Sequence, residues 1–127
     1  MIKKLEAKDI IKILEWDDRA EEFFPCSKSE WVQWLMSNID NPNILIIGCD
    51  KSYLVALNAV QLPLSDSITI LFFYSQDDFK YNLEIKVALN KWAKEKGAAK
   101  INFICKDIEV FKKYGASQTA IIGGWDL

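Results

Sequence analysis

Apolar residues gather in several short runs along the chain, and β-branched and aromatic side chains are frequent in them. Such runs, bounded by turn residues, are typical of β-strands. The predicted strands are residues 2–6, 44–49, 53–62, 67–74, 100–105 and 118–125. Asp50-Lys51-Ser52 is short enough to connect a hairpin, and residues 62–66 predict the next turn. The middle of the chain therefore predicts a meander of three strands.

Other segments repeat their apolar residues at the spacing of a helix. The first is expected to begin at Asp9 as its N-cap, and it is followed by an acidic, irregular connection from Glu15 to Glu22. The second begins at Ser27 or Ser29 and places Trp31 and Trp34 on one apolar face.

The longest helix is predicted from Asp77 to Lys96, where Gly97 is a typical C-terminal cap. Its apolar face consists of Ile85, Ala88, Leu89 and Trp92, and its outward side chains are Lys80, Glu84, Lys91 and Glu95. A shorter helix follows over residues 106–115. Because a strand precedes the long helix and another follows it, residues 67–74 and 100–105 are expected to form adjacent parallel strands.

Composition and charge narrow the classes of protein and partner. The 127 residues, 50% of them hydrophobic, predict one globular domain over 1–127. The longest apolar runs are far shorter than the ~20 residues of a membrane span, and no signal peptide is evident, so we expect no membrane partner and a cytoplasmic location. The net charge is −2 and Arg19 is the only arginine, which argues against a nucleic-acid partner.

The absence of histidine removes several reaction classes at once. Ser-His-Asp and Cys-His catalysis and histidine-containing zinc sites all require it. The cysteines Cys26, Cys49 and Cys105 are isolated and lack metal-ligand spacing, so no metal site is expected. A general base would have to be a carboxylate, a lysine, a tyrosinate or an ordered water.

Two phrases near the C-terminus resemble those of a known superfamily. Residues 93–101 (AKEKGAAKI) are similar to the end of the long helix and the following strand of the GNAT-type N-acetyltransferases. Residues 110–116 (VFKKYGA) resemble that family's Phe-Tyr-x-x-x-Gly-Phe phrase. With the order of the elements, the resemblance implies a GNAT-like α/β fold, in which a mixed (α+β) sheet of about six strands is flanked by about four helices.

The same resemblance implies a coenzyme A site and shows where this chain departs from the family. The family's loop Arg/Gln-x-x-Gly-x-Gly/Ala binds pyrophosphate through backbone N–H groups at a helix N-terminus. Asp77, Lys80 and Asn82 stand at its arginine and glycine positions. The family's frequent general acid, a tyrosine, corresponds to Phe111, which has no proton to donate, and the fourth strand has no carboxylate.

Because such enzymes hold their cofactor mainly through backbone groups, the resemblance still predicts acetyl-CoA as the cofactor. The predicted contacts are Phe73, Tyr74, Ser75, Lys80 and Asn82, and no catalytic residue is assigned. The acidic segment from Glu15 to Glu22 would lie at one wall of the acceptor cleft. There it either attracts a cationic amine or is simply a solvated surface.

Two main functions of different classes remain open, besides a third, a small-molecule pocket in the sheet cleft that is unrelated to coenzyme A. The first is a divergent acyl-CoA-dependent N-acetyltransferase, in which an amine attacks directly and water shuttles the proton. The second is a catalytically silent GNAT-fold module with a structural or protein-interaction role, similar to short GNAT-like proteins of tailed phages. We expect the five tryptophans to pack mainly in the core. The alternative is an exposed aromatic surface that binds a protein partner.

Overall fold

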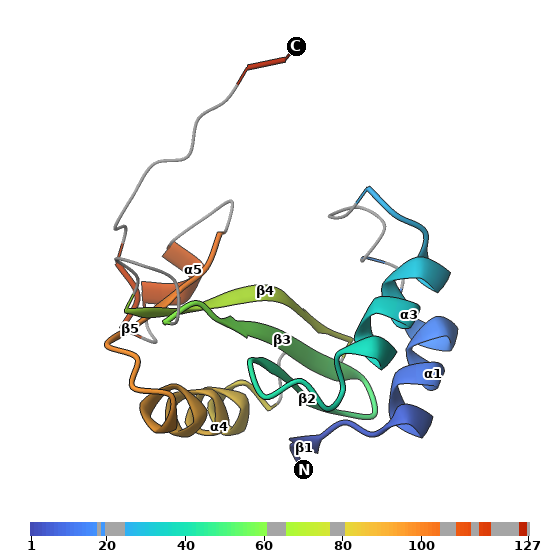
Figure 1. The fold of residues 1–127 in the computed structure, drawn as a ribbon, viewed down its shortest axis with the longest axis horizontal. Coiled ribbons are helices and arrows are strands. Elements are labelled where there is room, and N and C mark those ends of the chain that lie inside the picture. Colours follow the sequence, from blue (N-terminus) through green and yellow to red (C-terminus); the bar gives the residue numbers. More distant parts are fainter. Residues whose placement is uncertain are drawn as a thin grey trace.

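The computed structural model describes residues 1–17, 19, 25–60, 66–76, 81–104, 109–112, 115–117 and 125–126. Within these residues, one mixed sheet of five strands forms the centre of the fold (Figure 1). The spatial order equals the chain order: β1 (Lys3–Lys4), β2 (Ile44–Cys49), β3 (Ser52–Asn58), β4 (Ser67–Ser75) and β5 (Lys100–Asn102). Neighbouring strands from β1 to β4 are antiparallel, as the predicted meander requires, and β4 and β5 are parallel.

Helices cover both faces of this sheet. The described helices are α1 (Ala7–Trp16), α3 (Lys28–Ser37), α4 (Asn82–Glu95) and α5 (Glu109–Lys112). In Figure 1, α1 and α3 lie beside each other at one end of the view, α4 lies below the sheet, and α5 lies above its β5 end. No helix in the described ranges is long and apolar enough to cross a membrane.

The two faces of the sheet carry two separate hydrophobic cores. On one face, Ile10 and Ile13 of α1 and Leu35 of α3 pack against Tyr53 and Val55 of β3. On the other face, α4 packs against the alternate residues of the same strands through its Ile85, Leu89 and Ala93. Because successive strand residues point to opposite faces, β3 serves both cores.

The predicted parallel pairing beside the long helix is confirmed. Ser67, Ile68 and Thr69 of β4 pair with Lys100, Ile101 and Asn102 of β5, and α4 is the connection between the two strands. Ile85 and Leu89 are each 4% exposed, whereas Glu84 and Lys91 face solvent. The predicted apolar face of α4 is therefore correct in phase, with Trp92 half-buried at its margin.

A bulge in β4 changes which side chains face α4. Val55 of β3 pairs with Phe72, but the next residue, Ala56, pairs with Ile70, so Leu71 is an extra residue in β4. In a regular strand Ile70 and Phe72 would share a face. Here Ile70 and Phe73 pack on the α4 side, while Phe72 belongs to the core beneath α1 and α3.

Several predicted boundaries were wrong, for identifiable reasons. Helix α1 runs from Ala7 to Trp16. Its start differs from the prediction because Glu6 and Asp9 form a capping box, in which Asp9 is the third helical residue and not the N-cap. Helix α4 begins at Asn82 with Tyr81 as its N-cap, later than predicted, and Asp77 lies outside the described residues. Ser27, one of the two expected caps, is the N-cap of α3 and accepts a hydrogen bond from the Glu30 N–H.

Three strands are shorter than predicted, and the first of them, β1, covers only Lys3–Lys4 of the expected residues 2–6. Strand β3 ends at Asn58, whose side-chain oxygen accepts a hydrogen bond from the Val60 N–H at 3.1 Å and starts a turn, so residues 59–60 are not strand. Strand β5 ends at Asn102, and Phe103 and Ile104 follow its end. The predicted strand over 118–125 and most of the predicted helix over 106–115 lie outside the described residues.

Candidate functional site

The two parallel strands separate soon after they meet. Their register ends at Thr69 and Asn102, whereas β4 continues to Ser75. A cavity of about 670 Å³ lies at this separation and extends beneath α4. This volume is within the range of protein pockets that bind small molecules and cofactors.

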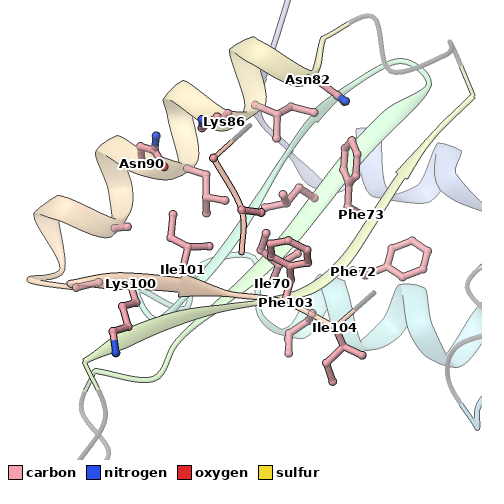
Figure 2. A pocket seen from close by; sticks show the side chains of 18 of the residues that line it. Ile70, Phe72, Phe73, Asn82, Lys86, Asn90, Lys100, Ile101, Phe103 and Ile104 are labelled. Atoms are coloured by element: carbon pink, nitrogen blue, oxygen red, sulfur yellow. The ribbon is translucent and has the colours of Figure 1, made fainter. Parts of the chain in front are cut away.

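Three elements form the walls of the cavity (Figure 2). Helix α4 contributes Asn82, Lys86 and Asn90, which follow one another along the helix because residues four apart share a face. Strand β4 contributes Ile70 and Phe73 from the opposite wall. The remaining wall is β5 with the residues beside it: Ala98, Ala99, Lys100, Ile101, Phe103 and Ile104.

The cavity reaches both faces of the sheet. Ile70 and Phe73, which line it, belong to the α4 core. Phe72 also lines it but belongs to the core beneath α1 and α3, and Figure 2 shows the Phe72 and Phe73 rings pointing in different directions. Consecutive strand residues point to opposite faces, which separates Phe72 from Phe73, and the bulge at Leu71 brings Ile70 to the same face as Phe73.

The charges in the described lining of the cavity are of one sign. This part of the lining contains four cations, Arg19, Lys86, Lys94 and Lys100, and no aspartate or glutamate. The chain as a whole is slightly acidic, with a net charge of −2, so this concentration of positive charge is local. Positive charge around a cavity favours an anionic ligand, although Arg19, Lys94 and Lys100 are exposed to solvent and Lys86 is the one that is half-buried.

A buried polar group lies next to the cavity on the α1–α3 face. The Tyr53 hydroxyl donates a hydrogen bond to the Asp17 carboxylate, and it accepts one from the Trp31 indole N–H at 2.9 Å. Asp17 and Tyr53 are both fully buried. Burial raises the pKa of Tyr53 far above its ordinary value of 10.0, and the hydrogen bond to Asp17 raises it further. Tyr53 is therefore a structural donor and is not accessible as a catalytic acid.

The residues predicted from the resemblance lie in different surroundings. Phe73 and Asn82 line the cavity. The Tyr74 ring stacks on Trp16 with ring centroids 5.9 Å apart, on the α1–α3 face. The Ser75 hydroxyl pairs with the Ser52 hydroxyl at 2.7 Å. Lys80 lies outside the described residues, and whether these residues contact a cofactor stays a prediction.

The acidic segment differs from the expectation at the residues that can be placed. Asp17 is fully buried and hydrogen-bonded, so it does not line a solvated wall. Glu15 is exposed on α1, and the other acidic residues of the segment lie outside the described part. Arg19, within the same segment, lines the cavity instead.

Sequence reasoning considered Lys86 as a cation near the pyrophosphate but did not assign Lys94, Lys100 or Arg19 to the site. Lys86 and Lys94 are eight residues apart with Asn90 midway between them, a spacing that places all three on one side of a helix. That spacing could have been recognised in the sequence. The sequence around Lys100 and Arg19 has no such pattern, because these residues reach the cavity only through the tertiary fold.

Comparisons with solved structures agree on the architecture. An aminoglycoside 6′-N-acetyltransferase from Acinetobacter baumannii matches with a TM-score of 0.74 at 12% identity, covering 100% of this chain and 97% of that one. An acetyltransferase from Trypanosoma brucei matches with a TM-score of 0.72 at 14% identity, covering 100% and 99%. AAC(6′)-Iy, solved with a CoA-containing bisubstrate analogue, matches with a TM-score of 0.70 at 10% identity, covering 100% and 97%.

The sequence gives no such match. No protein-family model matches it, and no curated protein matches it significantly. The structural likeness nevertheless covers the whole chain, and the mixed α+β architecture is that of the GNAT acetyltransferases. Likeness at these identities establishes the fold.

Proposed function

We propose that the cavity binds an acyl-CoA, with acetyl-CoA as the first candidate, and that the protein transfers the acyl group to an amine. The observation that carries this proposal is the combination of a gap between β4 and β5 with a lining whose described charges are all positive. Coenzyme A carries its negative charge on phosphates and presents an amide-containing, partly apolar arm. The cavity offers a partner for each of these chemical features.

Lys86 of α4 is the residue best placed to bind the phosphates, and Lys94 and Lys100 extend the positive wall. A lysine attracts phosphate as a compact point charge. Asn82 and Asn90, on the same side of α4, add amide donors. Together they would replace the glycine-rich loop that the chain lacks.

The arm of coenzyme A would lie along β4. The described pairing of β4 with β5 ends at Thr69, so the edge of the strand just beyond it, at Ile70 and Leu71, would be the part that meets the ligand. Ile70, Phe73 and Ile101 give the gap apolar sides. This wall resembles a pocket that binds through a few polar groups on a largely apolar surface.

The proposed reaction requires an amine to reach an acyl thioester held in the gap between β4 and β5. In acyl transfer, the amine nitrogen bonds to the thioester carbonyl carbon while the carbon–sulfur bond breaks, giving an amide and the thiol of coenzyme A. The proton lost by the amine passes through water to the departing sulfur. The chain's contribution is to hold the two reactants on opposite sides of the gap in the right orientation, which can supply much of the rate enhancement.

A silent binding module is the second candidate, favoured by one observation. The described lining of the cavity contains no carboxylate, tyrosine, cysteine, serine or threonine, so it holds none of the usual general acids or bases apart from lysine. In this case the protein binds an anionic ligand in the cavity but does not transfer an acyl group.

Two measurements test the proposal and separate the candidates. Calorimetry with acetyl-CoA and with coenzyme A measures binding, and free-thiol release from acetyl-CoA with a panel of amines measures transfer. Binding together with amine-dependent thiol release supports the acyltransferase. Binding without thiol release supports the silent module, and no binding at millimolar ligand overturns the proposed function.

A further inference from the structure

The lining of the cavity differs between its floor and its rim. Four lining residues have almost no contact with solvent and form the floor: Leu54 of β3 and Ile85, Leu89 and Ala93 of α4, each at most 5% exposed. All four belong to the core beneath α4. Lys94 and Lys100 also line the cavity, but they are exposed and therefore belong to its rim. A ligand that enters the cavity passes from a cationic rim to an apolar floor.

The walls between floor and rim carry apolar side chains that the protein covers only in part. The half-buried apolar residues of the lining are Ile70 and Phe73 of β4, Ile101 of β5, and Phe103 just beyond its end (Figure 2). Ile70, Phe73 and Ile101 pack against the core beneath α4, and each still leaves apolar surface open. Such surface favours an apolar ligand, because the ligand displaces water from it.

The charges of the described lining narrow the kind of apolar ligand that fits. They are all positive, so a cationic amphiphile is repelled and a neutral hydrocarbon makes no use of them. A ligand with an apolar chain and an anionic portion matches both the walls and the rim. A thioester of coenzyme A with an extended acyl chain has this composition, whereas an acetyl group supplies a single methyl group and leaves most of the apolar surface uncovered.

We propose that the apolar floor and walls bind the acyl chain of the donor, so that the protein selects medium-length acyl groups over acetyl. This inference rests on the proposed acyl-CoA site and specifies which acyl group that site prefers; acetyl-CoA is then a weaker ligand of the same site. The arm of coenzyme A is proposed to meet β4 at Ile70 and Leu71, which places the thioester end beside these walls. Each CH₂ group that is fully buried improves affinity about fourfold.

The test compares donors that differ only in the length of the acyl chain. Calorimetry measures the binding of coenzyme A and of its acetyl, butanoyl, hexanoyl and octanoyl thioesters, and hexanoyl-CoA should bind at least about tenfold more tightly than acetyl-CoA. Acetyl- and hexanoyl-pantetheine, which lack the phosphates, form a second series. Equal affinities for acetyl-CoA and hexanoyl-CoA overturn the inference and leave the proposed function in place. If no coenzyme A compound binds, the proposed function is overturned, and the pantetheine pair still shows whether an acyl chain is recognised.

Two variants change the size of the cavity in opposite directions. Ala98 is half-buried and lines the cavity, so Ala98→Leu should lower the ratio of hexanoyl-CoA to acetyl-CoA affinity at least about fourfold, the effect of one displaced CH₂ group. Ile101→Ala removes part of a wall and should shift the preference from hexanoyl-CoA towards octanoyl-CoA.

Ala88→Leu is the matched control. Ala88 is also half-buried and packs against the core beneath α4, but it does not line the cavity, so its ratio should equal that of wild type. Thermal melting checks that each variant is folded, and Ile101→Ala keeps the test decisive if Ala98→Leu is not. A chain-length preference that neither cavity variant changes, or that Ala88→Leu lowers as much as Ala98→Leu, overturns the inference.

Discussion

The Asp17 carboxylate and the Tyr53 hydroxyl are hydrogen-bonded to each other in the core, although they lie 36 residues apart in the sequence. The bond joins the end of α1 to the central strand β3. Trp31 of α3 donates to the same hydroxyl at 2.9 Å, so one polar group links both helices of this face to the sheet. A buried carboxylate needs such partners, because burial of an unpaired charge is costly.

Tyr53→Phe should therefore destabilise the protein by about 1–3 kcal/mol, the typical cost of leaving a buried polar partner unsatisfied. The change removes only the hydroxyl and leaves the ring in place, so loss of packing cannot explain the effect. Chemical denaturation at pH 7 gives the free energy of unfolding. A stability equal to that of wild type would show that Asp17 and Trp31 do not depend on this hydroxyl.

Leu89 and Val87 give a matched test of how α4 packs. Leu89 is 4% exposed in the core beneath α4, whereas Val87, half a turn away, is 68% exposed. Leu89→Ala should cost about 2–5 kcal/mol, as deletion of buried methyl groups usually does. Val87→Ala should change the free energy of unfolding by less than about 0.5 kcal/mol, as at most surface positions. Equal losses in the two variants would contradict this orientation of the helix.

The general arrangement was readable from the sequence because the hydrophobic periods are strong. The pattern over 67–104 predicted the parallel strands and the buried face of α4, and both are present. Side-chain hydrogen bonds to the backbone set two boundaries that the hydrophobic pattern did not predict. The Glu6–Asp9 capping box sets the start of α1, and the turn at Asn58 ends β3.

The candidate site was less predictable than the fold. Phe73 and Asn82 were named beforehand and line the cavity, but Arg19 and Lys100 reach it only through tertiary structure. The bulge at Leu71 also had no sequence signal, and it decides that Phe73 faces α4. Asp17 looked like part of a solvated acidic segment, and only its pairing with Tyr53 shows that it is buried.

The capping box of α3 predicts a pH dependence of stability. The Ser27 backbone N–H donates to the Glu30 carboxylate at 3.1 Å, and this bond holds the pKa of Glu30 below its ordinary value of 4.5. A carboxylate with a lowered pKa stabilises the folded state above its unfolded pKa and loses that effect as pH falls through the folded pKa. Glu30→Gln should lower the melting temperature at pH 7, and the difference should begin to shrink below pH 4.5 and disappear once the pH falls below the lowered pKa of the folded state. A difference that is constant with pH would contradict the charged capping bond.

Gly48 allows β2 and β3 to approach each other closely. A Cβ at this position would lie 2.2 Å from the Ser52 carbonyl oxygen and 2.8 Å from the Tyr53 Cα. Both are backbone atoms of the paired strand, so Gly48→Ala should cost more than about 2 kcal/mol, within the range of overpacking in a core. Gly97→Ala is the control: its φ is +79° but its Cβ would meet nothing within 4 Å, so only about 1 kcal/mol is expected. A smaller loss at Gly48 than at Gly97, measured by chemical denaturation, would refute the close approach.

The central claim is that the positive wall of α4 binds the phosphates of an acyl-CoA, and the most direct measurement is calorimetry of acetyl-CoA with a pair of charge reversals. Lys86 lines the cavity, whereas Lys91 lies on the exposed side of the same helix, so Lys86→Glu and Lys91→Glu change the net charge equally. At about 5 Å and an effective dielectric of 20–80, one charge pair is worth about 1–3 kcal/mol. Lys86→Glu should therefore raise the dissociation constant at least about fivefold, more strongly at low salt, while Lys91→Glu should leave it nearly unchanged. Equal affinities for wild type and Lys86→Glu, or no binding by wild type at millimolar acetyl-CoA, would contradict the claim.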